Sequence, residues 1–168
     1  MPALSWNTNL KLHLLGIGGL LNWTAALRAM KTCVFYFSRT GNTKRLAEGI
    51  SESLKVPAYD IAVTKPSVAG DYDLLIVGTP VTGFRPAVEV TGFLDQLPDS
   101  SGKKTIVFCT YAVGKGGTLK QMSQQLAKKG YETILAVGKR GVKPSKTDFQ
   151  EVLDEMAKAL ERQLPSKT

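Results

Sequence analysis

Residues 31–43 have the sequence KTCVFYFSRTGNT, an unbroken apolar run that passes directly into a loop of hydroxyl, glycine and amide residues. The run at 31–37 is rich in β-branched and aromatic side chains and too short for a buried helix, which predicts a strand covered on both faces. Apolar residues then recur at helical spacing up to Leu54, with Asn42 or Thr43 as the predicted helix cap. The segment therefore predicts a strand, a polar loop and a helix in succession.

The rest of the chain repeats this alternation of short apolar runs and amphipathic patterns. Strands that alternate with helices imply right-handed crossovers and a parallel sheet with helices on both faces. The sequence thus predicts a three-layer, doubly wound α/β fold with a five-stranded parallel sheet, most simply in the order 2-1-3-4-5. Thr147 and Gln150 are spaced as a capping box before the last helix. The predicted strands lie at 31–37, 59–63, 74–77, 105–108 and 133–137, and the apolar stripes of the helices at 46–54, 90–97, 119–126 and 149–160.

Composition limits the possible classes of protein. The chain has 168 residues, enough for one domain, and its 43% apolar and 21% charged residues are typical of a folded globular protein. With 22 basic and 14 acidic residues its formal charge is +8, which favours anionic ligands or partners without identifying them. One histidine and two cysteines, Cys33 and Cys109, cannot make a zinc site of the usual kind. Two apolar-flanked thiols suit a reducing compartment, so a cytoplasmic location is expected.

Residues 1–29 differ from the rest, because they hold both tryptophans and the sole histidine but no acidic residue. Met30 stands directly before the first strand, as a start codon would, so we interpret residues 1–29 as an over-called start or a loosely attached extension and residues 30–168 as the domain. An alternative is a surface helix that touches a membrane or partner. The apolar run at 10–21 is too short to span a bilayer and lacks a good signal-peptide cleavage site. Without this segment, 20 basic and 14 acidic residues leave a charge of +6.

In doubly wound sheets, ligands bind at the carboxyl ends of the strands where the connections diverge, here between the first and third strands. The loop at 38–43 lies there, and its hydroxyls, amide side chain and backbone N–H groups would converge where the helix dipole is positive. That arrangement favours a phosphate site. A capped strand-to-helix turn is the simpler alternative, but five of the six residues are of types that serve a phosphate loop.

Other phosphate-binding and phosphoacceptor motifs do not fit. Tyr36 stands where a Walker A motif needs its first glycine, and Leu21 and Leu119 fill the last glycine position of two candidate dinucleotide motifs. Cys33 and Arg39 have the cysteine-phosphatase spacing, but an extended strand between them separates the thiol from the loop by more than roughly 10 Å. The loops after strands one and three also lack the acidic residues of a phosphoacceptor receiver domain.

Residues 35–43, FYFSRTGNT, resemble the FMN phosphate loop of the flavodoxin family almost residue for residue, and the resemblance extends from Met30 to Leu164. It implies a flavodoxin-like fold and an FMN phosphate held by neutral donors, with Arg39 pointing outward into solvent. The residues of this loop that the resemblance assigns to cofactor binding are Ser38, Arg39, Thr40, Gly41, Asn42 and Thr43.

The resemblance also implies two loops beside the flavin ring. The first departs from the family because Thr82 is small, which leaves Phe84 as its only aromatic residue. Gly83 would lie near flavin N5, where a peptide that can flip accepts a proton, or it is only a turn glycine. Tyr111 would stack on the outer face of the ring or serve as strand-end packing, and nearby glycines would let the backbone approach the ring. The assigned residues are Pro80, Val81, Thr82, Gly83 and Phe84 in one loop and Thr110, Tyr111, Ala112, Val113 and Gly114 in the other.

The function that follows is an FMN-binding electron carrier between protein redox partners, a reductase and an electron acceptor, without a catalytic residue of its own. The alternative is an NAD(P)H-dependent or quinone-linked FMN oxidoreductase, disfavoured by the missing nicotinamide motif and the lack of a long insertion. A third possibility is a domain that has lost its flavin, because Thr82 weakens the ring site. Neither nucleic acid nor a membrane span is expected, no metal is implied, and the oligomeric state is left open.

Overall fold

A computed structural model describes residues 30–141 and 148–163, so the N-terminal segment 1–29 lies outside the described residues. Among the described residues, no helix combines the length and the apolar character needed to cross a bilayer. The elements in chain order are β1 (Thr32–Tyr36), α3 (Asn42–Leu54), β2 (Ala58–Asp60), the 3-10 helix η1 (Pro66–Asp71), β3 (Leu74–Thr82), β4 (Arg85–Pro86), α4 (Val88–Asp95), β5 (Lys104–Tyr111), α5 (Thr118–Lys128), β6 (Glu132–Arg140) and α6 (Gln150–Glu161).

All strands except β4 form a parallel sheet in the order β2-β1-β3-β5-β6. Because β5 and β6 are the fourth and fifth predicted strands, this confirms the predicted order 2-1-3-4-5. The two-residue strand β4, which the sequence analysis did not predict, pairs antiparallel with the end of β3. At the carboxyl edge, Pro80 of β3 is paired with Thr110 of β5, which is paired with Lys139 of β6. The ends of these three strands therefore lie side by side.

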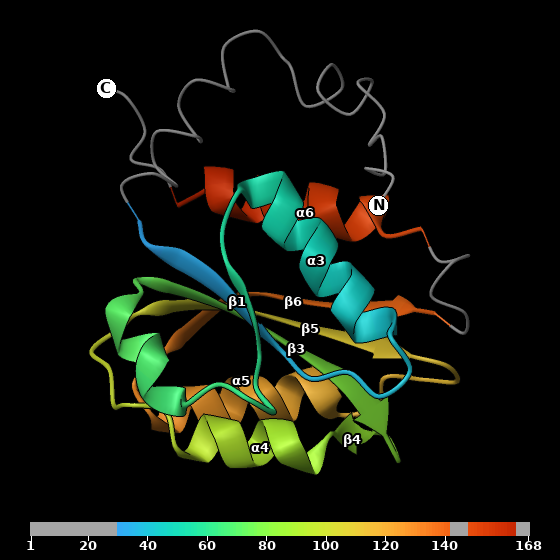
Figure 1. The fold of residues 1–168 in the computed structure, drawn as a ribbon, viewed down its shortest axis with the longest axis horizontal. Coiled ribbons are helices and arrows are strands. Elements are labelled where there is room, and N and C mark those ends of the chain that lie inside the picture. Colours follow the sequence, from blue (N-terminus) through green and yellow to red (C-terminus); the bar gives the residue numbers. More distant parts are fainter. Residues whose placement is uncertain (1–29, 142–147, 164–168) are drawn as a thin grey trace, which may run out of the picture.

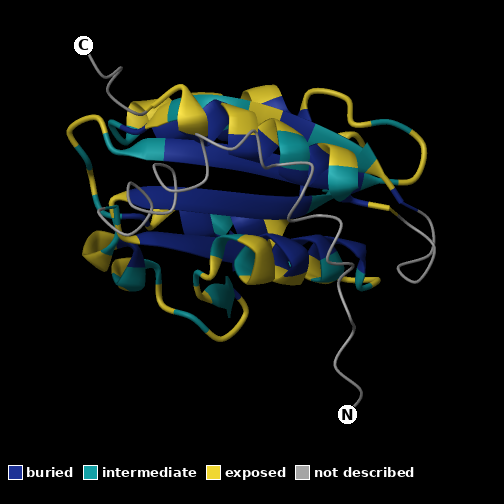
Figure 2. Cartoon of the chain, turned by 90° about the horizontal axis from the view of Figure 1, so that it is seen from above, coloured by how far each residue is buried: buried dark blue, intermediate teal, exposed yellow. Residues whose placement is uncertain are grey.

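Helices cover both faces of the sheet, as predicted. Figure 1 shows α3 and α6 on one face and α4 and α5 on the other. Side chains alternate along each strand, so the interior is divided into two apolar clusters, one beneath α3 and α6 and the other beneath α4 and α5. Figure 2 shows the buried strands between helices whose outer faces are exposed. Because β1 sends its helix to one face and β3 to the other, the carboxyl edge between them is the point where the connections diverge.

Several local predictions differ from the structure. The predicted strand at 59–63 ends at Asp60, whose carboxylate and carbonyl accept hydrogen bonds from the Ala62 amide (2.9 Å) and the Thr64 hydroxyl (2.7 Å) and so turn the chain. Neither residue predicted to cap α3 does so, because the helix starts from Gly41 in the left-handed conformation. Gln150 bonds forward to Asp154 instead of back in a capping box, and its proposed partner at position 147 lies outside the described residues.

Strand β3 continues past its predicted end at Val77 because Gly78 leaves space for an aromatic ring. A Cβ built on Gly78 would overlap the side chain of Phe108, which is fully buried on the neighbouring strand β5. The glycine is therefore a packing requirement of the sheet and not a chain break.

We expect Gly78→Ala to lower the free energy of unfolding by about 1–3 kcal/mol, since the added methyl group would force Phe108 out of its position. Gly92→Ala is the matched control, because a Cβ at this position in α4 meets nothing within 4 Å and alanine favours a helix by about 1 kcal/mol. Urea denaturation of both variants measures the difference. Equal stability of the two variants would contradict the account.

Both cysteines are packing residues. Cys33 and Cys109 have no exposed surface, and burial raises the pKa of each thiol to about 12, against a smaller opposing effect of Lys103 on Cys33 and of Lys115 on Cys109. A thiol with this pKa is protonated at physiological pH and is a poor nucleophile.

We therefore expect neither thiol to react with dithiobis(nitrobenzoate) at pH 8 in the folded protein, since the thiolate fraction is about a thousandfold below that of an ordinary cysteine. Both should react after unfolding in urea. Because folding raises these pKa values, the unfolded chain releases the thiol protons first, and stability should fall as the pH rises above about 9, by at most about 1.4 kcal/mol per pH unit per thiol. Rapid labelling of the folded protein would show that the thiols are accessible.

Candidate functional site

The amino end of α3 is open toward the loop that precedes it. Gly41 has a φ of 94°, and its amide donates to Ser38 Oγ at 3.1 Å, which curls the loop back on itself. The first helical hydrogen bond runs from the Arg45 amide to the Gly41 carbonyl at 2.9 Å, so the N–H groups of residues 42–44 lack a partner within the helix. The helix has no side-chain cap and no acidic residue in its first turn. The positive end of its dipole is therefore available to an anion.

Two buried side chains fix this helix end to the carboxyl edge of the sheet. Asn42 Nδ2 donates to the carbonyl of Gly141, just past β6, at 3.0 Å, while Asn42 Oδ1 is buried without a hydrogen-bond partner among the described residues. The hydroxyls of Thr43 and Thr110 are 2.7 Å apart, in contact between α3 and the end of β5. The first and third predicted loops are thus joined directly.

Arg39 lies outside this cluster and is paired with a carboxylate instead of pointing freely into solvent. Its guanidinium donates to both carboxylate oxygens of Glu89 in the first turn of α4, at 3.1 and 3.2 Å, and both side chains are exposed. A backbone hydrogen bond at the helix start and the bond from Arg39 together lower the pKa of Glu89. Thr40 is also exposed. The ion pair between Arg39 and Glu89 therefore links the first loop to α4.

The second predicted loop is a tight hairpin between β3 and β4. Thr82 is paired with Arg85, and the two residues between them, Gly83 and Phe84, both have positive φ, 57° and 61°. Positive φ at both central positions is typical of a type I′ turn, which suits the twist of a two-residue hairpin. Gly83 is thus a turn glycine in this structure, and Phe84 is a bulky residue in a conformation that such residues rarely adopt.

Contact with the third loop holds Phe84 in this conformation. A Cβ on Gly114 would lie 3.3 Å from the Phe84 ring, and a Cβ on Gly116 would lie 2.5 Å from the Cβ and the carbonyl oxygen of Phe84. From the sequence, these glycines were expected to let the backbone approach a flavin ring. In the structure they make room for the aromatic residue of the neighbouring hairpin.

The remaining residues of the third loop follow the end of β5. Tyr111 is half-buried, packs against the cluster beneath α4 and α5, and lies close to Gly138 of β6. Ala112 and Val113 are exposed, and the Ala112 carbonyl accepts a hydrogen bond from Arg140 Nε at 2.8 Å. In the second loop, Pro80 and Val81 are half-buried where β3 approaches its end.

All three predicted loops meet at one edge, and the structure adds residues that the sequence analysis missed. Thr79 accepts a hydrogen bond from the Ala87 amide at 3.0 Å and so fixes the base of the hairpin. Gly141 and Glu89 hold the first loop in place. No local signal points to Glu89 or Gly141, because their contacts join segments that are distant in sequence. Thr79 meets Ala87 only because the chain folds back in the hairpin.

Comparison with known proteins identifies the family. Residues 33–139 match the family model described as a flavodoxin domain. The chain belongs to this family. Flavodoxin from Megasphaera elsdenii is 27% identical over 109 residues, which cover 60% of this chain and 80% of the relative.

Solved flavodoxins have the same fold. The oxidised flavodoxin 1 of Bacillus cereus is 21% identical, with a TM-score of 0.67, and the match covers 80% of this chain and 99% of that protein. A flavoprotein from Lactobacillus acidophilus, solved in complex with FMN, is 20% identical, with a TM-score of 0.53 and coverage of 65% of this chain and 93% of that protein. These structures support the flavodoxin-like fold.

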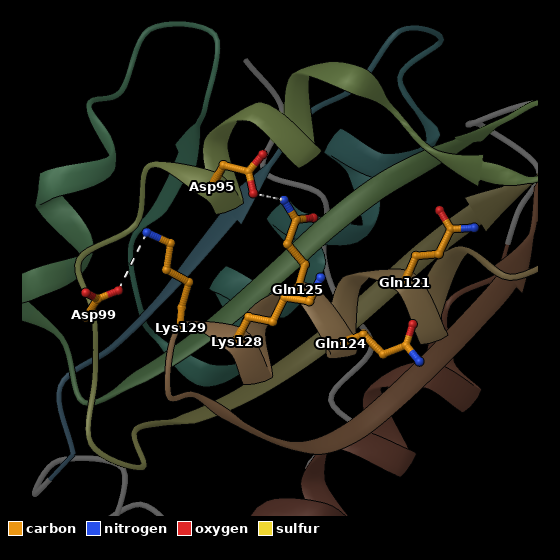
Figure 3. A pocket seen from close by; sticks show the side chains of 7 residues that line it. All are labelled: Asp95, Asp99, Gln121, Gln124, Gln125, Lys128 and Lys129. Carbon is orange, nitrogen blue, oxygen red and sulfur yellow. Dashed lines mark hydrogen bonds and ion pairs between the residues drawn. The ribbon is translucent and has the colours of Figure 1, made fainter.

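The flavodoxin domain also has an open hollow of about 540 Å³ between α4 and α5. Figure 3 shows its polar walls, with Gln125 bonded to Asp95 and Lys129 paired with Asp99. Asp95 ends α4 and Lys128 ends α5, so the hollow extends toward the amino edge of the sheet, away from the three loops.

We expect Gly116→Ala to destabilise the flavodoxin domain more than Gly83→Ala. Both glycines have positive φ, which costs alanine about 1 kcal/mol, but only at position 116 does the added methyl group meet Phe84, at a further cost of about 1–3 kcal/mol. Gly83 faces open space and is therefore the matched control. Urea denaturation measures the difference, and equal losses would exclude the contact with Phe84 as the reason for Gly116.

Proposed function

We propose that residues 30–168 bind FMN through its phosphate group at the loop of residues 38–43, and that the protein carries electrons between redox partners. Residues 1–29 are, in this proposal, an extension outside the FMN-binding unit. Support comes from membership of the flavodoxin domain family and from the open helix end at the carboxyl edge of the sheet.

The observation that carries the proposal is the free amino end of α3. Its first-turn amides lack partners in the helix, its first turn holds no carboxylate, and the hydroxyls of Ser38, Thr40 and Thr43 lie in the same short segment. These are the groups that a phosphate needs, because an anion is stabilised by converging N–H and O–H donors and by the helix dipole. Arg39 is bound to Glu89, so the donor set is neutral.

The donors and acceptors at the loop fit FMN in a second respect. Asn42 Oδ1 is a buried acceptor without a donor, and burying such a group costs free energy unless a ligand completes the bond. A hydroxyl of the ribityl chain or of a protonated phosphate could donate to it. Asn42 Nδ2 is held by Gly141, which fixes the orientation of the amide.

When bound, the flavin supplies the electron transfer, and the chain binds and orients it. In the proposed arrangement, Thr110 holds Thr43 at the phosphate, while the β3–β4 hairpin and the loop after β5 border the ring. The connections that follow the strands here are short, spanning residues 83–84 and 112–117, which favours a carrier with an accessible cofactor edge over an enzyme with a closed substrate pocket.

We expect the double variant Thr40→Ala/Thr43→Ala to bind FMN at least about a hundredfold more weakly, since each lost hydrogen bond to a charged group is worth about tenfold in affinity. Affinity for riboflavin, which lacks the phosphate, should change by less than about threefold. Quenching of flavin fluorescence on titration of the flavin-free protein measures both affinities.

Ser53→Ala is the matched control, because this exposed hydroxyl is on the same helix near its other end. Unchanged FMN affinity in the double variant, or no FMN binding by the native protein, would refute the proposal. Steady NAD(P)H consumption with a quinone as acceptor would instead favour the oxidoreductase alternative.

A further inference from the structure

The segments that form the second and third loops and the end of β6 carry cations and no carboxylates of their own. Segments 80–88, 111–118 and 138–141 contain Arg85, Lys115, Lys139 and Arg140 but no Asp or Glu. Pairing of the strand ends brings the three segments to one edge of the sheet. A local excess of positive charge attracts anionic partners and speeds their association.

Neighbouring acidic groups leave most of this charge uncompensated. The first carboxylate after the hairpin, Glu89, is bound by Arg39, and Glu151 pairs with Lys139 at 2.8 Å. Arg140 uses Nε to bond the Ala112 carbonyl, which holds its guanidinium beside the loop after β5. The structure gives no carboxylate partner to Arg85 or Lys115 among the described residues.

The same edge exposes apolar side chains. Of the four large apolar residues that are exposed in the described part of the chain, three lie here: Phe84, Val88 and Val113. Val113 immediately precedes Gly114, which lies against the Phe84 ring, and Val88 begins α4 two residues after β4. Apolar contacts surrounded by charges are the usual composition of a transient protein interface.

We propose that this surface, formed by Phe84, Arg85, Val88, Val113, Lys115 and Arg140 and here called the cationic rim, docks a redox protein with a carboxylate-rich face. Carboxylates of the partner pair with the cations, and its apolar surface contacts Phe84, Val88 and Val113. The role of this contact in electron transfer rests on the proposed function, since the rim borders the loops assigned to the flavin ring.

The shape of the rim favours a protein over other polyanions. Its apolar side chains project from a two-residue hairpin, a loop and the first residue of a helix, so they do not form the continuous apolar helix face that lies in a membrane interface. Its only aromatic residue rests on a glycine loop, whereas single-stranded nucleic acids bind to rows of stacking aromatic residues.

The test uses the full chain, with and without FMN, and an acidic plant-type [2Fe–2S] ferredoxin as the probe. Binding is measured by calorimetry between 20 and 300 mM NaCl, with basic cytochrome c as the opposite-charge probe.

We expect the ferredoxin to bind more tightly than cytochrome c at low salt, and its affinity to fall as salt screens the rim. Arg85→Glu/Lys115→Glu should weaken ferredoxin binding at least about tenfold, and Arg85→Gln/Lys115→Gln by a smaller factor.

Lys31→Glu/Lys128→Glu is the matched control. It changes the net charge by the same amount at exposed positions before β1 and at the end of α5, and it should change the affinity by less than about threefold. Equal effects of the two double variants, no binding of ferredoxin, or tighter binding to phosphatidylserine vesicles or duplex DNA at the same salt would each overturn the docking proposal.

The outcomes separate the two proposals. If the chain binds no FMN but the charge reversals weaken ferredoxin binding as expected, the docking surface stands and the carrier function fails. If FMN binds and the charge reversals have no effect, the docking proposal alone fails. Circular dichroism and urea midpoints of each variant check that the fold is retained.

Discussion

The contact between the amino end of α3 and the carboxyl edge of the sheet governs the geometry of the proposed site. The Thr43–Thr110 hydroxyl pair and the bond from Asn42 to the Gly141 carbonyl hold the helix against the ends of β5 and β6. Open amides form a useful anion site only if they point in a fixed direction, because a mobile helix end would have to be ordered when the ligand binds. The two contacts with the sheet hold the amides in one direction before any ligand binds.

Cationic side chains near the site have different roles because of their neighbours. Arg39 is occupied by Glu89 and connects the first loop to α4, whereas Arg85 and Lys115 extend from the hairpin and the third loop without a carboxylate partner among the described residues. In the proposed function, neutral donors bind the phosphate and cations at the outer edge bind the partner, so cofactor binding and partner recognition use different residues. If cations bound the phosphate instead, a change in their charge would alter cofactor binding and partner recognition together.

Much of the fold was predictable from local patterns, because buried parallel strands are continuously apolar and the helices show a clear stripe, as at Leu46 and Ile50. The loop of residues 38–43 was recognisable as a polar connection between β1 and α3 because all its residues are contiguous. Contacts between distant segments were not. No local signal shows that Gly78 must accommodate Phe108, that Gly116 must accommodate Phe84, or that the strand containing Thr82 folds back into a hairpin.

Because the sheet divides the interior into two clusters, the two sides of the site can change separately during evolution. The loop of residues 38–43 leads into α3, which packs with α6 on one face of the sheet. The β3–β4 hairpin and the loop after β5 lead into α4 and α5 on the other face. Substitutions packed in separate layers have nearly independent energetic effects. New specificity can therefore arise on one side of the sheet while the contacts on the other side are kept. The Thr43–Thr110 hydroxyl pair and the Arg39–Glu89 ion pair are contacts that couple the two sides.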